Sequence, residues 1–247
     1  MIPLLAAIQF LLLSPAFVRR AFTARELGAA TAFYPLVGLL LGALLALADF
    51  LLGYLFPLQV RSALVLALWV VLTGGLHLDG FLDTCDGLLG GSTPEQRLEI
   101  MRDERVGAYA LAGGVILYLI LFSSLGAIIT SRWAVLLLAP VLGRWGITLA
   151  VVSFPYARPA GLGRDIKDHA GIPQLAFATF TTLVVVGILA FYLRIYSPLI
   201  ALVVAALICW LAARFIMRRI HGMTGDIYGA LNMLIEAGVL LTFVALK

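Results

Sequence analysis

The sequence predicts an all-α protein, a polytopic bundle with about seven or eight helices that cross a membrane. Its 247 residues are 63% hydrophobic and only 12% charged, with a mean hydropathy of +1.08, whereas soluble domains carry about 25% charged residues. The apolar residues form runs close to the length of about 20 residues that a helix needs to cross a bilayer. No repeat, low-complexity tract or long linker divides the sequence, so we expect residues 1–247 to form a single membrane domain.

Eight apolar runs are the candidate spans. The first is short and interrupted by Pro3 and Pro15, which makes it a candidate re-entrant segment. The second is overlong and contains Pro35 and Asp49, so a tilt or a kink is expected there. The eight runs lie near residues 2–18, 27–56, 63–78, 109–129, 133–154, 174–192, 198–216 and 228–246.

The basic residues predict which end of the bundle faces the cytoplasm. If the loops between eight spans alternate sides, one side receives twelve Lys and Arg residues and the other four, while Arg144 lies within a span (12 + 4 + 1 = 17). Cytoplasmic loops carry the excess of Lys and Arg, so the richer side is predicted to be cytoplasmic. The twelve are Arg19, Arg20, Arg25, Arg97, Arg102, Arg105, Arg158, Arg164, Lys167, Arg214, Arg218 and Arg219; the four are Arg61, Arg132, Arg194 and Lys247.

An acidic stretch at residues 73–107 stands out, because it holds seven of the thirteen Asp and Glu residues of the chain. Asp79, Asp83 and Asp86 are spaced i, i+4 and i+7, which places them on one face of a helix. Such close carboxylates repel one another unless a cation lies among them, and oxygen ligands suit Mg²⁺ or Mn²⁺ better than zinc. We therefore expect a metal site, the alternative being a hydrated helix end. This stretch is the predicted cytoplasmic catalytic segment.

A second helix is predicted directly after the aspartates, over residues 94–104. Thr93 followed by Pro94, with Gln96 three residues after Thr93, is typical of a capped helix start. Glu99 lies on the acidic face of this helix and is a candidate further metal ligand, whereas the simpler interpretation is a solvated surface helix. His77, just before the aspartates, is a candidate ligand or general base, or a histidine that is merely hydrogen-bonded near the interface.

Three further polar groups fall at or near the predicted cytoplasmic side. Arg144 lies in the middle of an apolar run, where an arginine costs at least a few kcal/mol and needs a carboxylate or an anionic ligand. The loop 155–164 combines two arginines with two glycines, which allow close approach to phosphate, although lipid headgroups are an alternative ligand. Asp226 lies at the mouth of the last run, and Glu236 lies inside it; pairing of Glu236 with Arg144 would give that glutamate a structural role.

Several motifs resemble the cobalamin synthase family, the adenosylcobinamide-GDP ribazoletransferases. Over about 35 residues the chain reads G-G-L-H-L-D-G-F-L-D-T-C-D-G and then P-E-Q-R-L-E-I-M-R-D-E-R-V-G. F-Y-P-L-V-G at 33–38, A-R-P-A-G-L-G at 157–163 and T-G-D-I-Y-G-A at 224–230 are also similar to the family. One position departs from its pattern: Met233 stands where the family usually has the first of two acidic residues, and Glu236 remains as the second.

The resemblance implies a Mg²⁺-dependent, multi-pass enzyme of the bacterial inner membrane, with its active site on the cytoplasmic side. It would join adenosylcobinamide-GDP to α-ribazole, or to α-ribazole 5′-phosphate, and release GMP. The bilayer and other late enzymes of the cobamide pathway are expected partners, and nucleic acid is not. Candidate metal ligands are Asp79, Asp83, Asp86 and Glu99; candidate catalytic residues are His77, Asp103 and Arg105; candidate substrate and phosphate ligands are Arg144, Arg158, Gly161, Gly163, Arg164, Asp226 and Glu236.

Two other functions compete with this assignment. Asp83-x-x-Asp86-Gly87 resembles the start of the motif of CDP-alcohol phosphotransferases, but Leu88, Leu89 and Gly90 occupy the positions where that family has an Ala-Arg pair. A cation-coupled transporter could also use the aspartates. Transporters, however, usually place their sites near the midplane between repeats, and this chain shows neither feature.

Overall fold

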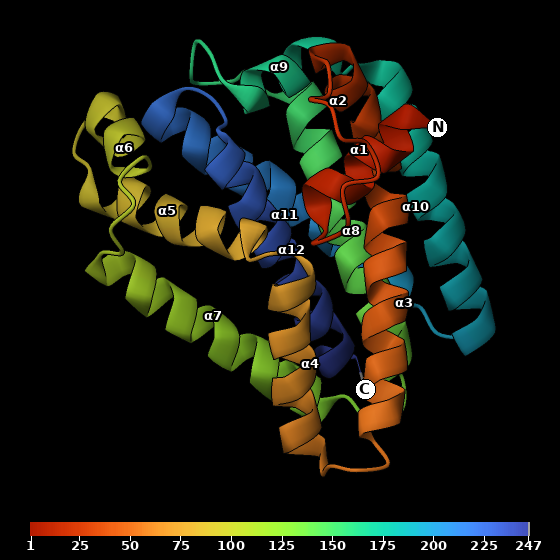
Figure 1. Cartoon of the computed structure of the whole chain (residues 1–247). Helices are drawn as coiled ribbons and strands as arrows, with labels where there is room; N and C mark the ends of the chain where they lie inside the picture. The colour runs from red at the N-terminus through yellow and green to blue at the C-terminus, as the bar shows by residue number, and fades with distance from the viewer. Residues whose placement is uncertain (247) are drawn as a thin grey trace.

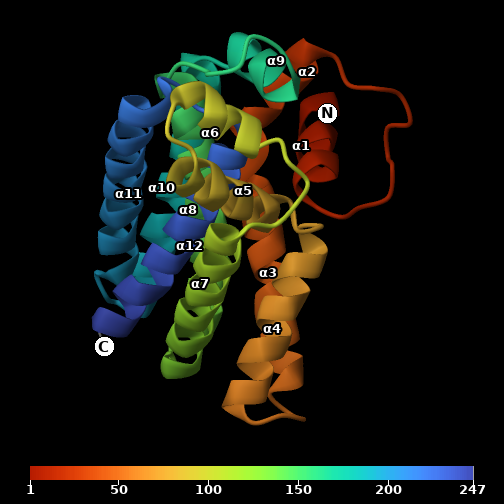
Figure 2. The ribbon, with the colours of Figure 1, turned by 90° about the vertical axis from the view of Figure 1, so that its left-hand side faces the viewer.

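The computed structural model describes residues 1–246 and is helical along most of that length (Figures 1 and 2). Lys247, which the charge count places on the far side of the membrane, lies outside the described residues. The elements are α1 (Ile2–Leu11), α2 (Ala24–Ala30), the short 3-10 helix η1 (Thr31–Phe33), α3 (Tyr34–Leu52), α4 (Leu58–Leu72), α5 (Leu76–Gly90), α6 (Pro94–Ile100), α7 (Ala108–Ala127), α8 (Arg132–Ser153), α9 (Leu162–His169), α10 (Ile172–Leu193), α11 (Ser197–Ile220) and α12 (Gly225–Ala245).

The helices confirm a polytopic membrane bundle. Within residues 1–246, six segments are long and apolar enough to cross a membrane, and a seventh is formed if α4 and α5, bent by 90° to each other, count as one span. The first apolar run does not supply an eighth, because the 10 residues of α1 reach only about 15 Å at 1.5 Å per residue. The six are Ala24–Leu52, α7, α8, α10, α11 and α12.

The overlong second apolar run, predicted near residues 27–56, is divided by a short 3-10 helix. Residues 31–33 form η1 between α2 and α3, and Pro35 lies at the beginning of α3. A proline in the first helical turn removes no hydrogen bond, because that N–H has no partner inside the helix anyway. The kink expected at Pro35 is therefore replaced by a helix start.

The short helices gather at one end of the bundle. Both views show α2, α6 and α9 at that end, and the connection from α3 to α4 at the other (Figures 1 and 2). The last turn of α11 joins the first group, because Arg97 Nη1 on α6 donates to the carbonyl oxygen of Arg219 at 3.0 Å. Most of the basic residues assigned to the richer side thus belong to elements at one end.

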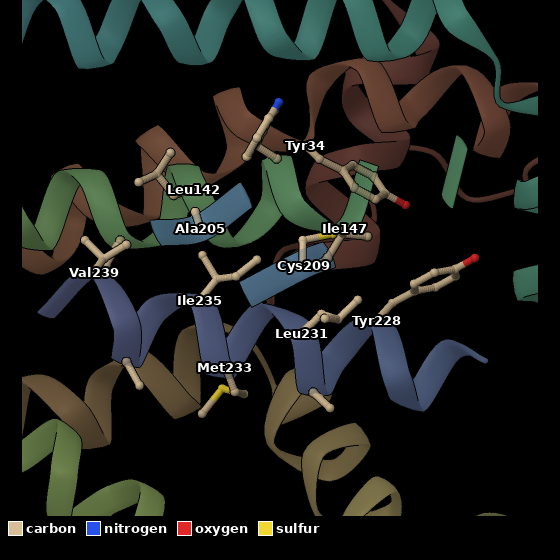
Figure 3. Packing of buried hydrophobic residues seen from close by; sticks show 14 of the residues in the cluster. Tyr34, Leu142, Ile147, Ala205, Cys209, Tyr228, Leu231, Met233, Ile235 and Val239 are labelled. Atoms are coloured by element: carbon tan, nitrogen blue, oxygen red, sulfur yellow. The ribbon is translucent and has the colours of Figure 1, made fainter. Parts of the chain in front are cut away.

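Helices α8 and α12 form the centre of the bundle. In their apolar windows 83% and 78% of the residues are buried, against 28% in α10 and α11. Figure 3 shows Ile235 of α12 packing towards Leu142 of α8 and Ala205 of α11. Close approach of α3 to α8 needs a small residue, since a Cβ on Gly42 would lie 2.7 Å from the carbonyl oxygen of Leu136, and such small-residue contacts drive helix association in membranes.

A buried ion cluster ties the other end of the bundle together. Arg132 Nε at the start of α8 donates to Asp49 Oδ1 at 2.7 Å, and Arg132 Nη2 donates to Ser62 Oγ on α4 at 3.1 Å. Arg61 approaches the same carboxylate at 3.2 Å. The Asp49 carboxylate of α3 therefore links this helix to α4 and α8 through ion pairs with Arg61 and Arg132.

Candidate active-site cavity

The polar site begins where α4 breaks into α5. Gly74 and Gly75 have φ values of 59° and 72°, a left-handed conformation that glycine adopts without a steric penalty. The break turns the chain by 90°, so α5 runs across the bundle instead of continuing α4 (Figure 1). The helix predicted for the three aspartates is confirmed, and Gly80 and Gly87 lie within it.

Two glycines hold α5 against the start of α12. A Cβ on Gly80 would lie 2.7 Å from the carbonyl oxygen of Asp226, and a Cβ on Gly229 would lie 3.1 Å from that of His77. This contact brings Asp226 close to Asp79 and Asp83. Asp83 is half-buried, and Asp79, Asp226 and Arg158 lie close enough for their charges to act on it.

A short backbone bridge places Arg158. The Ala157 N–H donates to the Met223 carbonyl and the Met223 N–H to the Pro155 carbonyl, each at 2.8 Å. The loop after α8 is thereby tied to the start of α12. Arg158 Nη2 then donates to Asp226 Oδ2 at 2.8 Å in a half-buried ion pair.

These groups line a cavity of about 410 Å³, within the usual range of about 300–1,000 Å³ for small-molecule sites. The helix starts at Leu162 and Gly225 also line it, and helix N-termini attract anions through free N–H groups and the helix dipole. Gly161, with φ 115°, leads into the first of these helices. One end of the cavity therefore combines carboxylates, arginines and two helix N-termini.

The cavity gathers only part of the predicted site. His77, Asp79, Arg158, Gly161, Gly163 and Asp226 line it, and Asp83 lies beside it. The remaining predicted residues are not among its lining residues: Asp86, Glu99, Asp103, Arg105, Arg144, Arg164 and Glu236.

Asp86 caps the next transmembrane helix. Its Oδ2 accepts from the Gly107 N–H at 2.6 Å and its Oδ1 from the Ala110 N–H at 2.8 Å, which satisfies the free donors at the start of α7. Glu99 is exposed on α6. Among the described residues no group of three or more His, Cys, Asp or Glu side chains lies close enough to hold a metal ion, so the predicted four-carboxylate set is not assembled.

The helix predicted for residues 94–104 is α6 and ends earlier, at Ile100. Beyond it, Arg105 Nη2 donates to Asp103 Oδ2 at 2.6 Å on the protein surface. The hydrogen bonds from Arg105 lower the pKa of the Asp103 carboxyl from 3.8 to about 2. A carboxylate of such low basicity is a poor general base at neutral pH, which speaks against the predicted catalytic role of Asp103.

Two arginines predicted to bind phosphate have partners of their own. Arg164 Nε donates to Asp168 Oδ2 at 2.8 Å on exposed α9. Arg144 is fully buried, and its Nη1 donates to Glu236 Oε1 at 2.6 Å. This pairing of Arg144 with Glu236 indicates the structural role that the sequence left open for both residues.

The same arginine orients His77. Arg144 Nη2 lies 3.5 Å from His77 Nδ1, and a guanidinium can only donate. Nδ1 is then the acceptor, and the neutral ring carries its proton on Nε2. With that tautomer His77 presents a hydrogen-bond donor at Nε2, which does not suit the predicted role of general base.

Sequence reasoning missed the aromatic and second basic residues of the cavity. Tyr34, Tyr156, Tyr228 and Arg102 all line it. Tyr34 and Tyr228 stand inside the motifs F-Y-P-L-V-G and T-G-D-I-Y-G-A, so the motifs carry the signal, although tyrosines do not stand out in an apolar sequence as charged residues and histidines do.

Comparison with known proteins assigns the chain to a family. The family model for cobalamin-5-phosphate synthase matches residues 3–244. The chain is 44% identical to the adenosylcobinamide-GDP ribazoletransferase of Stutzerimonas stutzeri, over 97% of this chain and 96% of that protein. It is 40% identical to that of Pseudomonas fluorescens (98% of each) and 39% identical to that of Desulforamulus reducens (95% and 92%). No solved structure matches it.

Proposed function

The chain belongs to the cobalamin-5-phosphate synthase family, and we propose that its cavity is where adenosylcobinamide-GDP is joined to α-ribazole or α-ribazole 5′-phosphate. One observation supports this assignment most. The residues of the family motifs, separated in sequence, meet around a single cavity whose polar end suits phosphate groups. The multi-pass bundle and its basic end favour a site at the cytoplasmic face of a bacterial inner membrane.

The reaction is the displacement of GMP by an alcohol. A hydroxyl oxygen of α-ribazole attacks the phosphorus that carries the cobinamide, loses its proton, and forms the new P–O bond. The bridging P–O bond breaks, and its electron pair leaves with GMP. Arg158, the cavity arginine held by Asp226, and Arg102 are placed to neutralise the charge that spreads over the phosphate oxygens.

Magnesium fits this site as a cofactor shared with the substrate. Mg²⁺ usually takes one or two carboxylates, several waters and substrate phosphates, and Asp79 and Asp83 lie one helical turn apart on α5, near Asp226 where Gly80 lets α5 and α12 touch. Asp79 and Asp83 would hold the ion, and Asp226 would position Arg158. When bound, the ion would supply charge neutralisation on the pyrophosphate oxygens.

The test is turnover by the purified protein in lipid nanodiscs. With Mg²⁺ and both substrates it should release GMP and form the joined product, and chelation of the metal should stop the reaction. Asp83→Asn should abolish turnover because it removes a ligand without changing the side-chain shape. Asp168→Asn, at an exposed carboxylate of α9 that does not line the cavity, is the matched control. Activity on CDP-linked substrates in place of adenosylcobinamide-GDP would instead favour the CDP-alcohol phosphotransferase alternative.

A further inference from the structure

Part of the cavity wall has a different chemistry. Apolar side chains of α1, α8 and α9, among them Leu11, Ile147 and Ile166, form what we call its apolar end. Phosphates gain nothing from such a wall, because burying a charge against apolar atoms is unfavourable. This end therefore suits an uncharged, apolar part of a substrate.

Aromatic rings frame this region. Tyr34 of α3 stacks on Phe10 with ring centroids 6.4 Å apart, and Tyr156 lies 6.2 Å from Tyr228 of α12. Figure 3 shows Tyr34 of α3 and Tyr228 of α12 with their hydroxyl groups turned to the same side. Flat aromatic walls favour a planar ring as ligand, since rings of this kind stack on one another.

Two buried polar atoms of the wall lack a protein partner. Tyr228 is 7% exposed and His77 is 3% exposed, and neither Tyr228 Oη nor His77 Nε2 makes a hydrogen bond within the described residues. A buried polar atom without a partner is destabilising, so a ligand is expected to supply one. His77 Nε2 is a donor, because Arg144 leaves the ring proton there, and the Tyr228 hydroxyl can donate as well as accept. A ligand with acceptor atoms would therefore satisfy both.

We propose that this apolar end binds the planar base of the nucleoside substrate, with Tyr228 Oη donating to the free ring nitrogen and His77 donating towards the ribose. The inference rests on the proposed function. A benzimidazole base presents one acceptor nitrogen and otherwise only carbon to the wall. Guanine carries several donors and acceptors, which this wall would leave unpaired, and the corrinoid is too large for a cavity of about 410 Å³.

The test separates the two substrates kinetically. Tyr228→Phe removes only the hydroxyl, so the KM for α-ribazole should rise about two- to tenfold, the effect of one neutral hydrogen bond. The KM for adenosylcobinamide-GDP should stay unchanged. Tyr192→Phe, on exposed Tyr192 of α10, is the control. If Tyr228→Phe does not fold, inhibition of the unaltered enzyme by the free benzimidazole base decides instead.

Inhibition of the unaltered enzyme gives an independent measurement. The free benzimidazole base should compete with α-ribazole and not with adenosylcobinamide-GDP, and Tyr228→Phe should raise its inhibition constant by the same factor as the KM. A rise in the KM for adenosylcobinamide-GDP alone would assign this end to guanine, and no change in either KM would remove the subsite; both results overturn the proposal. An unaltered enzyme that forms no product contradicts the proposed function instead.

Discussion

Replacement of Glu236 with glutamine tests whether the buried pair of Arg144 and Glu236 is structural. The two side chains are 0% and 2% exposed, and their closest atoms lie 2.6 Å apart. Glutamine keeps the shape of the side chain, so neither a cavity nor a clash is introduced. What changes is the charge, because Arg144 is then left with neutral neighbours only: Asn232 Oδ1 and the Pro140 carbonyl, both at 3.4 Å, and His77 Nδ1 at 3.5 Å.

The expected loss is about 3–5 kcal/mol, the usual effect of removing one partner of a buried ion pair. For a chain of this size that corresponds to a fall in Tm of about 6–20 °C, which thermal unfolding of the purified protein in detergent would detect. The double variant Arg144→Met with Glu236→Leu removes both charges and should recover most of the stability, since hydrophobic replacement of a buried pair is often neutral or better.

Turnover measurements distinguish a structural role of the Arg144–Glu236 pair from a role in substrate binding. The double variant should fold but turn over more slowly, because His77 loses the arginine that fixes its tautomer. The structural interpretation would be refuted if Glu236→Gln melted at the temperature of the unaltered protein and instead weakened the binding of one substrate. That result would return both residues to the substrate-binding set.

Two further predictions concern the aspartates that lie outside the cavity. Asp86→Ala should lower the free energy of unfolding by about 0.5–2 kcal/mol through loss of the α7 cap while leaving the apparent Mg²⁺ affinity of turnover unchanged; weaker Mg²⁺ activation would make Asp86 a metal ligand after all. Asp103→Asn should leave the dependence of kcat on pH unchanged between about pH 5 and 9, because Arg105 lowers the pKa of Asp103 to about 2. The stability that this ion pair contributes is present above the usual carboxyl pKa and is lost only as the pH falls towards 2. An altered basic or acidic limb of the profile would show that Asp103 takes part in proton transfer.

The sequence predicts the bundle well because apolar length and charge placement are properties of single segments. The helix that carries Asp79, Asp83 and Asp86 follows in the same way from its spacing. Shared placement on one face, however, does not decide where each side chain turns. The Asp86 carboxylate accepts hydrogen bonds from the N–H groups of Gly107 and Ala110. The spacing of residues within α5 does not predict this contact with another helix.

The cavity illustrates the other limit. Tyr228 and Asp79 come from segments almost 150 residues apart, and the close contacts of Gly80 with Asp226 and of Gly229 with His77 bring their helices together. A charged residue in an apolar sequence is unusual and marks a candidate site, whereas a tyrosine there is expected as an ordinary residue of the packed core. The polar half of the site was therefore recognisable before the fold, and the aromatic half was not.

The glycine pair at the α4–α5 break also bears on how the chain enters the membrane. Residues 58–90 are one nearly continuous stretch, apolar in its first half and acidic in its second. An aspartate carried to the bilayer centre costs about 2.5–3.5 kcal/mol, and α5 holds three of them. Because Gly74 and Gly75 turn the chain between these halves, α4 can insert to its full depth without drawing the carboxylates after it. The two glycines thus separate the half of this stretch that can enter the bilayer from the half that carries the aspartates.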